Sequence, residues 1–125
     1  MKYSKNIDRT LRQWDKEYKK GFTSYVILLF LKNETLYGYE IKNKLEELTD
    51  HAISYQDSGI YQILKKLSSK KLVVSEKKVS NKGPIRKYYS ITDAGLQLIE
   101  LFTKDYVLPI NNALDDLIRK TFPEE

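Results

Sequence analysis

The feature that most constrains this chain is the order of its parts between Leu36 and Ile91, where two short helical patterns precede a basic β-hairpin. Residues 57–91 contain nine Lys or Arg residues against two acidic residues, a net charge of +7, while the whole chain carries only +5. Residues 1–20 have a net charge of +4, and residues 92–125 have a net charge of −4. The modest total therefore conceals a concentrated basic block, which is the footprint expected of a surface that contacts phosphates.

Composition excludes several classes of protein. The length of 125 residues suits one domain with helical extensions, and the chain has no cysteine and a single histidine, His51. Disulfides, thiol catalysis and clusters of His or Cys metal ligands are thereby removed, and no Gly-rich phosphate loop is present. We therefore expect no enzyme, no metal and no cofactor, and we interpret Asp115-Asp116 and Glu46-Glu47 as solvated helix faces.

Hydropathy indicates a soluble, cytoplasmic protein without a membrane partner. The longest apolar stretch, Tyr25–Leu31, is far shorter than the roughly 18 residues that are needed to cross a bilayer. The first twenty residues are charged throughout and lack the apolar core of a secretion signal.

Residues 1–20 are expected to form an amphipathic N-terminal helix. Its apolar residues recur at spacings of four, three and four positions, on one helical face: Ile7, Leu11, Trp14 and Tyr18. We interpret Trp14 as an apolar anchor that packs on the rest of the protein, and the Lys and Arg residues as the solvated face. An alternative places those cations on DNA phosphates. Gly21 is expected to end or bend the helix.

The next segments predict the first part of a helix-turn-helix. Phe22–Leu31 is nearly all apolar and predicts a buried helix, and Thr35–Leu48 has the apolar spacing of a second helix. Gly38 falls in the first turn of that second helix, where the missing side chain lets a neighbouring backbone come close. Thr49–Gln56 is expected to be the turn before the following helix.

The helix that follows, with Asp57 or Ser58 as its N-cap, has two different faces. Its buried stripe is expected to consist of Ile60, Ile63, Leu64 and Leu67. Its opposite face consists of Ser58, Tyr61, Gln62, Lys65, Lys66 and Ser69. Hydrogen-bond donors, an acceptor, a ring and two cations suit base edges and phosphates, whereas an ordinary solvated surface is the alternative interpretation.

Two β-prone segments come next, Leu72–Val79 and Ile85–Ile91, and a turn-forming segment separates them. Two strands around a basic tip, directly after a helix, predict the wing of a winged helix-turn-helix, which we assign to residues 21–92. Lys82 at the tip and Arg86 beside it would reach a neighbouring minor groove, where the negative potential favours Arg. The expected fold class is therefore mainly α with a small β-hairpin (α+β).

Residues 93–125 are expected to form a long C-terminal dimerisation helix. Thr92 or Asp93 caps it, and Pro109 should kink or split it, because proline lacks the backbone donor and clashes with the previous turn. Apolar residues recur every three or four positions, and we assign them to the contact with a second copy: Ile99, Phe102, Tyr106, Ile110, Leu114 and Leu117.

Three segments together resemble the PadR-like family of transcriptional regulators. Leu36–Ile41 is similar to the YGYEI signature of that family, and Ile60–Leu67 is similar to its recognition helix, usually written LYPALKRL. Gly83–Gly95 is similar to its wing-to-helix segment, GxPRKYYxLTxxG. The three motifs stand in the family's order and spacing.

The chain departs from the family pattern at three places. Gln62 stands where the recognition helix usually has proline, and Ser58-Gly59 stands where Gly-Thr is usual. Lys71 replaces the usual glycine before the first strand, so we expect a less comfortable backbone conformation there. These departures bear on the operator sequence rather than on the fold.

The resemblance implies a winged helix-turn-helix homodimer that represses transcription from a palindromic operator. Many members release DNA when a small-molecule effector such as a phenolic acid binds, in some of them in an aromatic-lined cavity at the dimer centre. Trp14, Phe102 and Tyr106 are the candidate liners here, and packed dimer core is the alternative role for these rings.

We therefore expect a sequence-specific transcriptional regulator whose partners are double-stranded DNA and a second copy of itself. The residues assigned to DNA contact are Ser58, Tyr61, Gln62, Lys65, Lys66, Lys70, Lys77, Lys78, Lys82, Arg86 and Lys87. Two alternatives use the same surface: a winged-helix module that binds proteins, and a nonspecific, chromatin-type DNA-binding protein.

Overall fold

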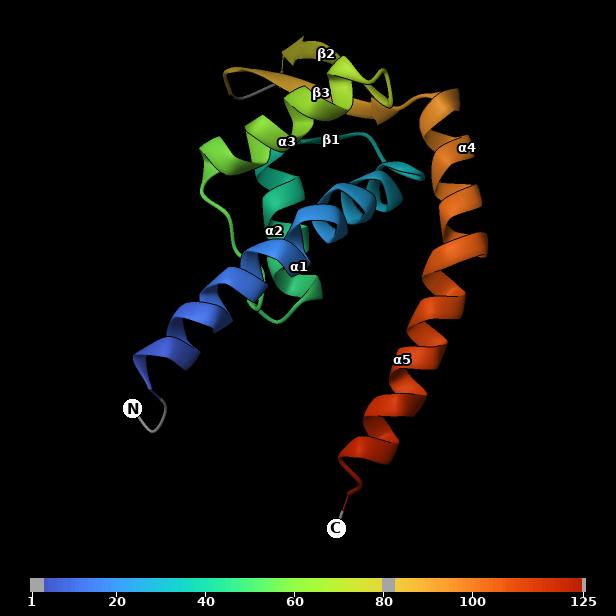
Figure 1. Ribbon diagram of the computed structural model, residues 1–125. Coiled ribbons are helices and arrows are strands. Elements are labelled where there is room, and N and C mark those ends of the chain that lie inside the picture. Colours follow the sequence, from blue (N-terminus) through green and yellow to red (C-terminus); the bar gives the residue numbers. More distant parts are fainter. Residues whose placement is uncertain (1–3, 80–82, 125) are drawn as a thin grey trace.

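The protein is mainly helical, with a small antiparallel sheet at one end of the molecule (Figure 1). The structure is a computed structural model that describes residues 4–79 and 83–124. In chain order its elements are α1 (Lys5–Leu31), β1 (Leu36–Tyr37), α2 (Gly38–Leu48), α3 (Asp57–Ser69), β2 (Val73–Val79), β3 (Ile85–Ile91), α4 (Asp93–Phe102), the π-helical segment η1 (Thr103–Val107) and α5 (Leu108–Thr121). The expected winged helix-turn-helix, mainly α with a hairpin, is confirmed.

The first helix is a single element of 27 residues rather than two shorter ones. Ser4 caps it by accepting a hydrogen bond of 3.2 Å from the backbone N–H of Ile7. The helix does not end at Gly21, because a glycine inside a helix costs only about 1 kcal/mol relative to alanine and the chain on its C-terminal side is held by burial. The expected end of the first helix near residue 20 is therefore wrong.

The three strands are arranged in the order β1-β3-β2, and both pairings are antiparallel. Leu36 pairs with Tyr89 and Tyr37 pairs with Tyr88, so these two residues are a short strand and not the first turn of the second helix. The expected start of that helix at Thr35 is corrected accordingly: α2 begins at Gly38. A pairing across some fifty residues of chain overrides the local helical pattern.

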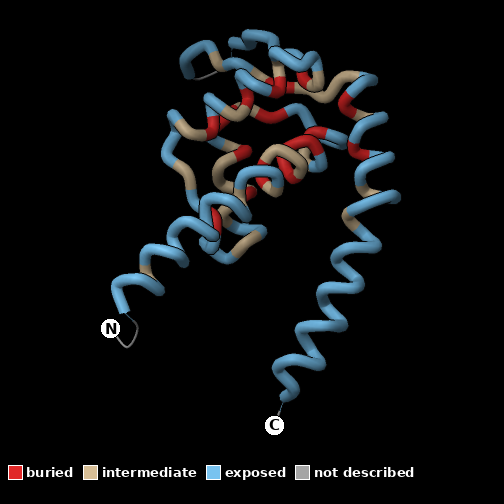
Figure 2. The backbone as a smooth tube through the Cα atoms, in the orientation of Figure 1, coloured by how far each residue is buried: buried red, intermediate tan, exposed pale blue. Residues whose placement is uncertain are grey.

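The hydrophobic core lies where the C-terminal half of α1, α2, α3, the sheet and α4 meet (Figure 2). Its buried apolar residues are Val26, Ile27, Leu28, Leu31, Leu36, Ile41, Leu45, Ile53, Ile60, Leu64, Leu67, Val73, Tyr89 and Ile99. Fully burying one such side chain stabilises a fold by about 1.5–3 kcal/mol. One buried polar residue, Thr23, shares a hydrogen bond of 3.0 Å with the hydroxyl of Tyr55. The core thus fixes α3 and the sheet relative to each other.

Two helix caps decide where the elements around the core begin. Thr92 is the N-cap of α4, as expected, and its Oγ1 accepts a hydrogen bond of 3.1 Å from the Gly95 N–H. The N-cap of α3 is Gln56, whose side chain makes no capping hydrogen bond, so neither expected cap is correct. Asp57 lies instead in the first turn of α3, where its carboxylate suits the positive end of the helix dipole.

The C-terminal helices run as one rod from Asp93 to Thr121, and α5 extends away from the body on the side opposite the sheet (Figures 1 and 2). Pro109 lies in the first turn of α5, and η1 directly precedes it. The wider π-helical turn accommodates proline, which lacks a backbone N–H donor. The interruption expected at Pro109 is therefore a local widening of the helix. No residue of α5 is buried. Within the described ranges, no helix is long and apolar enough to cross a membrane.

Candidate nucleic-acid interface

The exposed face of α3 consists of the residues that the sequence assigned to it. Ile60, Leu64 and Leu67 are buried in the core. The exposed side chains on the helix are those six, Ser58, Tyr61, Gln62, Lys65, Lys66 and Ser69, together with Asp57 in its first turn. Ser69 donates a hydrogen bond of 3.0 Å to the Lys65 carbonyl oxygen, so its hydroxyl is already used within the helix. The other five groups remain available to a partner.

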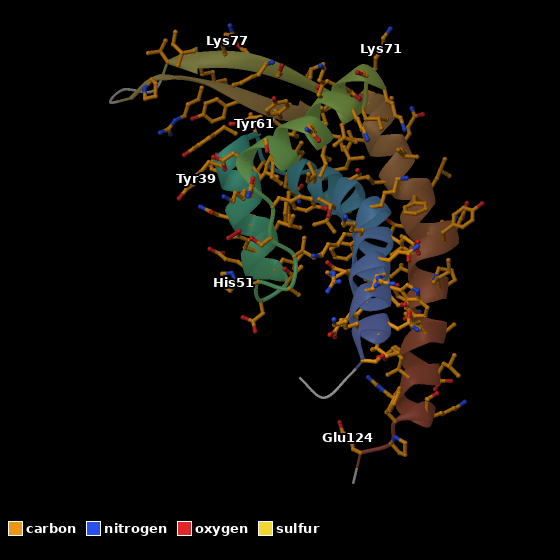
Figure 3. The ribbon with its side chains drawn as sticks, turned by 60° about the vertical axis from the view of Figure 1, so that its left-hand side comes forward. Tyr39, His51, Tyr61, Lys71, Lys77 and Glu124 are labelled. Atoms are coloured by element: carbon orange, nitrogen blue, oxygen red, sulfur yellow. The ribbon has the colours of Figure 1, made fainter. Side chains whose placement is uncertain are left out.

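Tyr61 is held against the start of α2. A Cβ atom on Gly38 would lie 2.8 Å from the Tyr61 ring, so a larger residue at this position would make the ring shift. The expected close approach at Gly38 is real, but a side chain rather than a backbone makes it. Tyr61 still keeps 47% of its surface exposed, between α3 and the start of α2 (Figure 3). Gly38 thus leaves space for the ring in this position, while nearly half of the Tyr61 surface faces solvent.

Tyr89 lies beneath this region, in the core. Burial raises the pKa of the Tyr89 hydroxyl above its ordinary value, and the nearby Tyr61 hydroxyl adds to the increase. Its neutral form is therefore favoured in the folded chain.

The turn between α2 and α3 is fixed by side-chain contacts. Thr49 donates a hydrogen bond of 2.9 Å to the Leu45 carbonyl oxygen and accepts one of 3.0 Å from the Ile53 N–H. Lys42 of α2 forms an ion pair of 3.3 Å with Asp57 at the start of α3. These contacts hold the two helices of the motif at one relative angle, which is what a helix that enters a groove requires.

The wing carries like charges directly opposite each other on two successive rungs. Lys77 pairs with Lys87, and Lys78 pairs with Arg86. Because alternate residues of a strand point to opposite faces, the first pair lies on one face of the sheet and the second pair on the other. Like charges that face each other across a sheet are destabilising. A binding partner rich in negative charge would relieve this repulsion.

Two tyrosines hold the second of these cation pairs, a feature that the sequence analysis missed. The guanidinium carbon of Arg86 lies 4.4 Å from the centre of the Tyr37 ring, and Lys78 Nζ lies 5.4 Å from the centre of the Tyr88 ring. The two rings pack edge to face, with 5.4 Å between their centres. Little in the sequence indicated the contact between Tyr37 and Arg86, because the two residues lie far apart in the chain and Tyr37 was assigned to a helix.

Not all of the assigned cations lie together. Lys66 and Lys70 face a groove of about 750 Å³ between α1, α3 and α4, and Gln62 also lines this groove. Lys16 and Lys20 of α1 line the opposite side. Lys82 lies outside the described residues. The DNA assignment therefore divides into a central group on α3, the wing pairs, and a lateral group that faces α1.

The neighbouring Lys71 has a φ of 61°, in the left-handed region that favours glycine. The expected strain at this position is thus present. Lys71 is exposed and points outward at the sheet end of the molecule, as does Lys77 (Figure 3).

The C-terminal residues assigned to dimer contact are exposed, with one exception. Ile99 is only 3% exposed and belongs to the core of its own chain, so its assignment to the contact between copies is wrong. The exposed members are Phe102, Tyr106, Ile110, Leu114 and Leu117. Together they form the apolar face of the C-terminal rod.

The aromatic candidates for an effector site are partly ordered within one chain. Phe102 packs edge to face on Tyr25, with ring centres 5.2 Å apart, and lies 5.8 Å from the Tyr106 ring centre. Trp14 is 68% exposed, so the interpretation of this residue as an anchor on its own chain is wrong. The stripe of Ile7, Leu11, Trp14 and Tyr18 is exposed along the N-terminal half of α1.

Comparison with known proteins agrees with this geometry. A family model described as the transcriptional regulator PadR-like family matches residues 27–101, more than half of the chain. The chain is similar to the crystal structure of a PadR-like transcriptional regulator from Bacillus cereus, with 32% identity and a TM-score of 0.69 over 80% of this chain and 94% of that one. A PadR-like transcription factor from Bacteroides fragilis gives 26% identity and a TM-score of 0.67 over 84% and 98% of the two chains.

A third similar structure is PadR from Bacillus subtilis in complex with operator DNA. It has 29% identity and a TM-score of 0.57, and the match covers 64% of this chain and 45% of that protein. The similarity therefore spans less than half of the Bacillus subtilis protein.

Proposed function

Because this chain belongs to the PadR-like family of transcriptional regulators, we propose that it is a cytoplasmic, homodimeric repressor that binds double-stranded DNA at a palindromic operator. The observation that carries this proposal is the exposed face of α3 beside a wing that has four cations on two successive rungs. Polar side chains such as those exposed on α3 form hydrogen bonds with base edges in the major groove. Lys and Arg side chains such as those of the wing bind phosphates.

Tyr61, Gln62 and Lys65 are the side chains that we propose to reach the major groove. All three are exposed, and Tyr61 and Gln62 lie in the N-terminal half of α3, from which recognition helices mainly contact bases. Lys65 lies about one turn beyond Tyr61 on the same helix. Ser58 suits a phosphate at the helix N-terminus, where the backbone N–H groups favour an anion. A role in DNA binding is supported by the similar Bacillus subtilis protein, whose structure is a complex with operator DNA.

The dimer proposal rests on two exposed apolar helix faces. They belong to segments of opposite net charge. The apolar stripe of α5 is exposed, as is that of the N-terminal half of α1. Residues 1–20 carry a net charge of +4 and residues 92–125 carry −4, so contact between these segments of two copies is electrostatically favoured. A two-fold dimer places its recognition helices about 34–36 Å apart, which matches successive turns of one duplex face.

The small-molecule effector remains part of the proposal, at the same contact. All three rings are exposed in a single chain, and contact of α1 in one copy with the C-terminal rod of the other would bring Trp14 near Phe102 and Tyr106. Trp14 is the single tryptophan, so its fluorescence reports this region directly. Quenching by a phenolic acid, together with release of DNA, supports the site; unchanged fluorescence and DNA affinity assign the rings to packed dimer core.

The test of the main proposal is selection of bound sequences from a random duplex pool, followed by anisotropy titrations at several salt concentrations. We expect a palindromic sequence, and an affinity that falls with salt by about 0.9 log unit per decade for each phosphate contact. Lys65→Ala and Arg86→Ala should each weaken binding while leaving the fold intact, whereas Lys32→Ala, at the end of α1 beside α4, should not weaken it. Sedimentation gives the mass of the complex.

Two outcomes would replace the proposal by another. A uniform ladder in footprinting, without a selected sequence, would indicate nonspecific chromatin-type binding. Absence of duplex binding at any salt concentration would favour the protein-binding module.

A further inference from the structure

We propose that Tyr37 and Tyr88 form an aromatic platform that positions Arg86 and Lys78 as a pair for one stretch of the DNA phosphate backbone. The inference rests on the proposed function and assigns a role to two residues outside the recognition helix. The platform lies on β1 and β3, where Tyr37 and Tyr88 are directly paired.

The geometry of the platform orders two cations that would otherwise repel each other. Arg86 stacks over Tyr37 at 4.4 Å, and Lys78 lies over Tyr88 at 5.4 Å, while Lys78 and Arg86 themselves are cross-strand partners. The negative face of each ring attracts the cation above it. The rings therefore offset part of the repulsion and keep both charges on the same face of the sheet.

Burial distinguishes Arg86 from the other three cations of the wing, Lys77, Lys78 and Lys87, which are exposed. Arg86 is half-buried, whereas Ile85 and Lys87 on either side of it are exposed. The Lys77–Lys87 rung has no cation–π contact among the residues that the structure describes. Lys87 is therefore a suitable control position, because it is a cation next to Arg86 in sequence that has no such contact with a ring.

The chemistry of a stacked guanidinium suits a phosphate. A ring on one face of Arg86 leaves the N–H groups at the edge of the guanidinium plane free to bind two oxygens at once. In the described part of the chain, neither Arg86 nor Lys78 forms an ion pair with a carboxylate. No carboxylate among the described residues therefore pairs with either positive charge.

The platform is also joined to the recognition helix. Tyr37 immediately precedes Gly38, and the ring of Tyr61 packs on Gly38. The wing cations and the groove-facing side of α3 are thereby set by one stretch of chain, so the two contacts with DNA hold a fixed spacing. Tyr37 and Tyr88 are positioning residues: they act through Arg86 and Lys78.

The first test uses the free protein. In a ring-stacked arginine the side-chain protons are shifted by the ring current, so the Arg86 δ-proton resonances should move toward random-coil values in Tyr37→Leu. Tyr37→Phe keeps the ring and should leave these resonances nearly unchanged. Thermal unfolding of each variant checks that the fold is retained. This readout does not depend on DNA binding.

The second test is a double-mutant cycle on the selected duplex. We expect Tyr37→Leu to lower affinity about three- to ten-fold, as a cation–π contact of this kind allows, and Arg86→Ala to add little in the Tyr37→Leu background. Lys87→Ala should have the same effect in both backgrounds.

Each remaining outcome overturns part of the reasoning. Additive effects of Tyr37→Leu and Arg86→Ala would refute the platform, because the two residues would then act independently. A loss of affinity in Tyr37→Phe equal to that in Tyr37→Leu would also refute it and would assign the contact to the Tyr37 hydroxyl. A wild-type protein that binds no duplex would refute the proposed function, while the Arg86 resonances would still decide whether the platform exists.

Discussion

Replacing Lys77 by glutamate should stabilise the free protein while weakening its hold on DNA. Lys77 and Lys87 face each other across the hairpin, and both side chains are exposed. A cross-strand charge pair changes stability by about 0.2–1 kcal/mol, with a sign that depends on the charges. Lys77→Glu exchanges a repulsion for an attraction, but exposure to solvent screens both.

The expected gain after this screening is about 0.5 kcal/mol at low salt, or roughly 2 °C in melting temperature for a domain of this size. The gain should shrink as salt is raised toward 1 M, where the screening length falls to about 3 Å. In the same variant the DNA affinity should fall about tenfold, and the slope of log affinity against log salt should decrease by about one.

Thermal unfolding without DNA and anisotropy with DNA, at fixed protein concentration, measure the two effects. Lys77→Gln removes the charge alone and should give about half of each change. Lys32→Glu, an exposed position outside the sheet, controls for the change in net charge. A melting temperature that falls in Lys77→Glu, or a gain that is independent of salt, would refute the electrostatic reasoning about the wing.

Three further changes have directions that follow from the packing. Gly95→Ala should cost about 1–3 kcal/mol in urea unfolding, because its Cβ would meet the Leu72 carbonyl oxygen and lie 2.6 Å from Ile91 Cγ1. Tyr89 has a raised pKa, so its contribution to stability is present below pH 10.0 and is lost as the pH rises through its folded pKa; in Tyr89→Phe the alkaline loss should be shallower. Leu114→Asp, at an exposed position, should leave the fold intact and halve the sedimenting mass.

These three expectations can each fail in a distinct way. Unchanged urea midpoints in Gly95→Ala would mean that the contact between α4 and the turn before β2 relaxes freely. An identical alkaline profile in Tyr89→Phe would assign the loss of stability to other tyrosines. A dimeric Leu114→Asp protein would exclude the α5 stripe from the contact between copies.

Periodicity in the sequence predicted α3 and the wing well. The spacing of Ile60, Leu64 and Leu67 allows only one buried face, so the exposed side chains of that helix followed directly. The hairpin boundaries and the Thr92 cap were likewise local features. Elements that depend on near neighbours in the chain are those that a sequence specifies most clearly.

The errors arose where distant segments meet. Leu36 and Tyr37 have helical spacing but pair with β3, and that pairing also creates the ring contact with Arg86. Ile99 belongs to a continuous apolar stripe, yet the body covers its part of α4 and leaves α5 uncovered. Trp14 was expected to pack on its own chain because an apolar stripe does not reveal whether its partner is the same chain or another copy.

The π-helical turn Thr103–Val107 sets the direction in which the C-terminal rod presents its apolar stripe. Each residue of an α-helix advances the stripe by about 100° around the axis, so removing a single residue from this turn would rotate Leu114 by that angle. A second copy bound to the stripe would rotate by the same angle. The α3 helix of that copy would then face a different side of the DNA. In a dimer of this kind, the widened turn would therefore set the relative orientation of the two α3 helices.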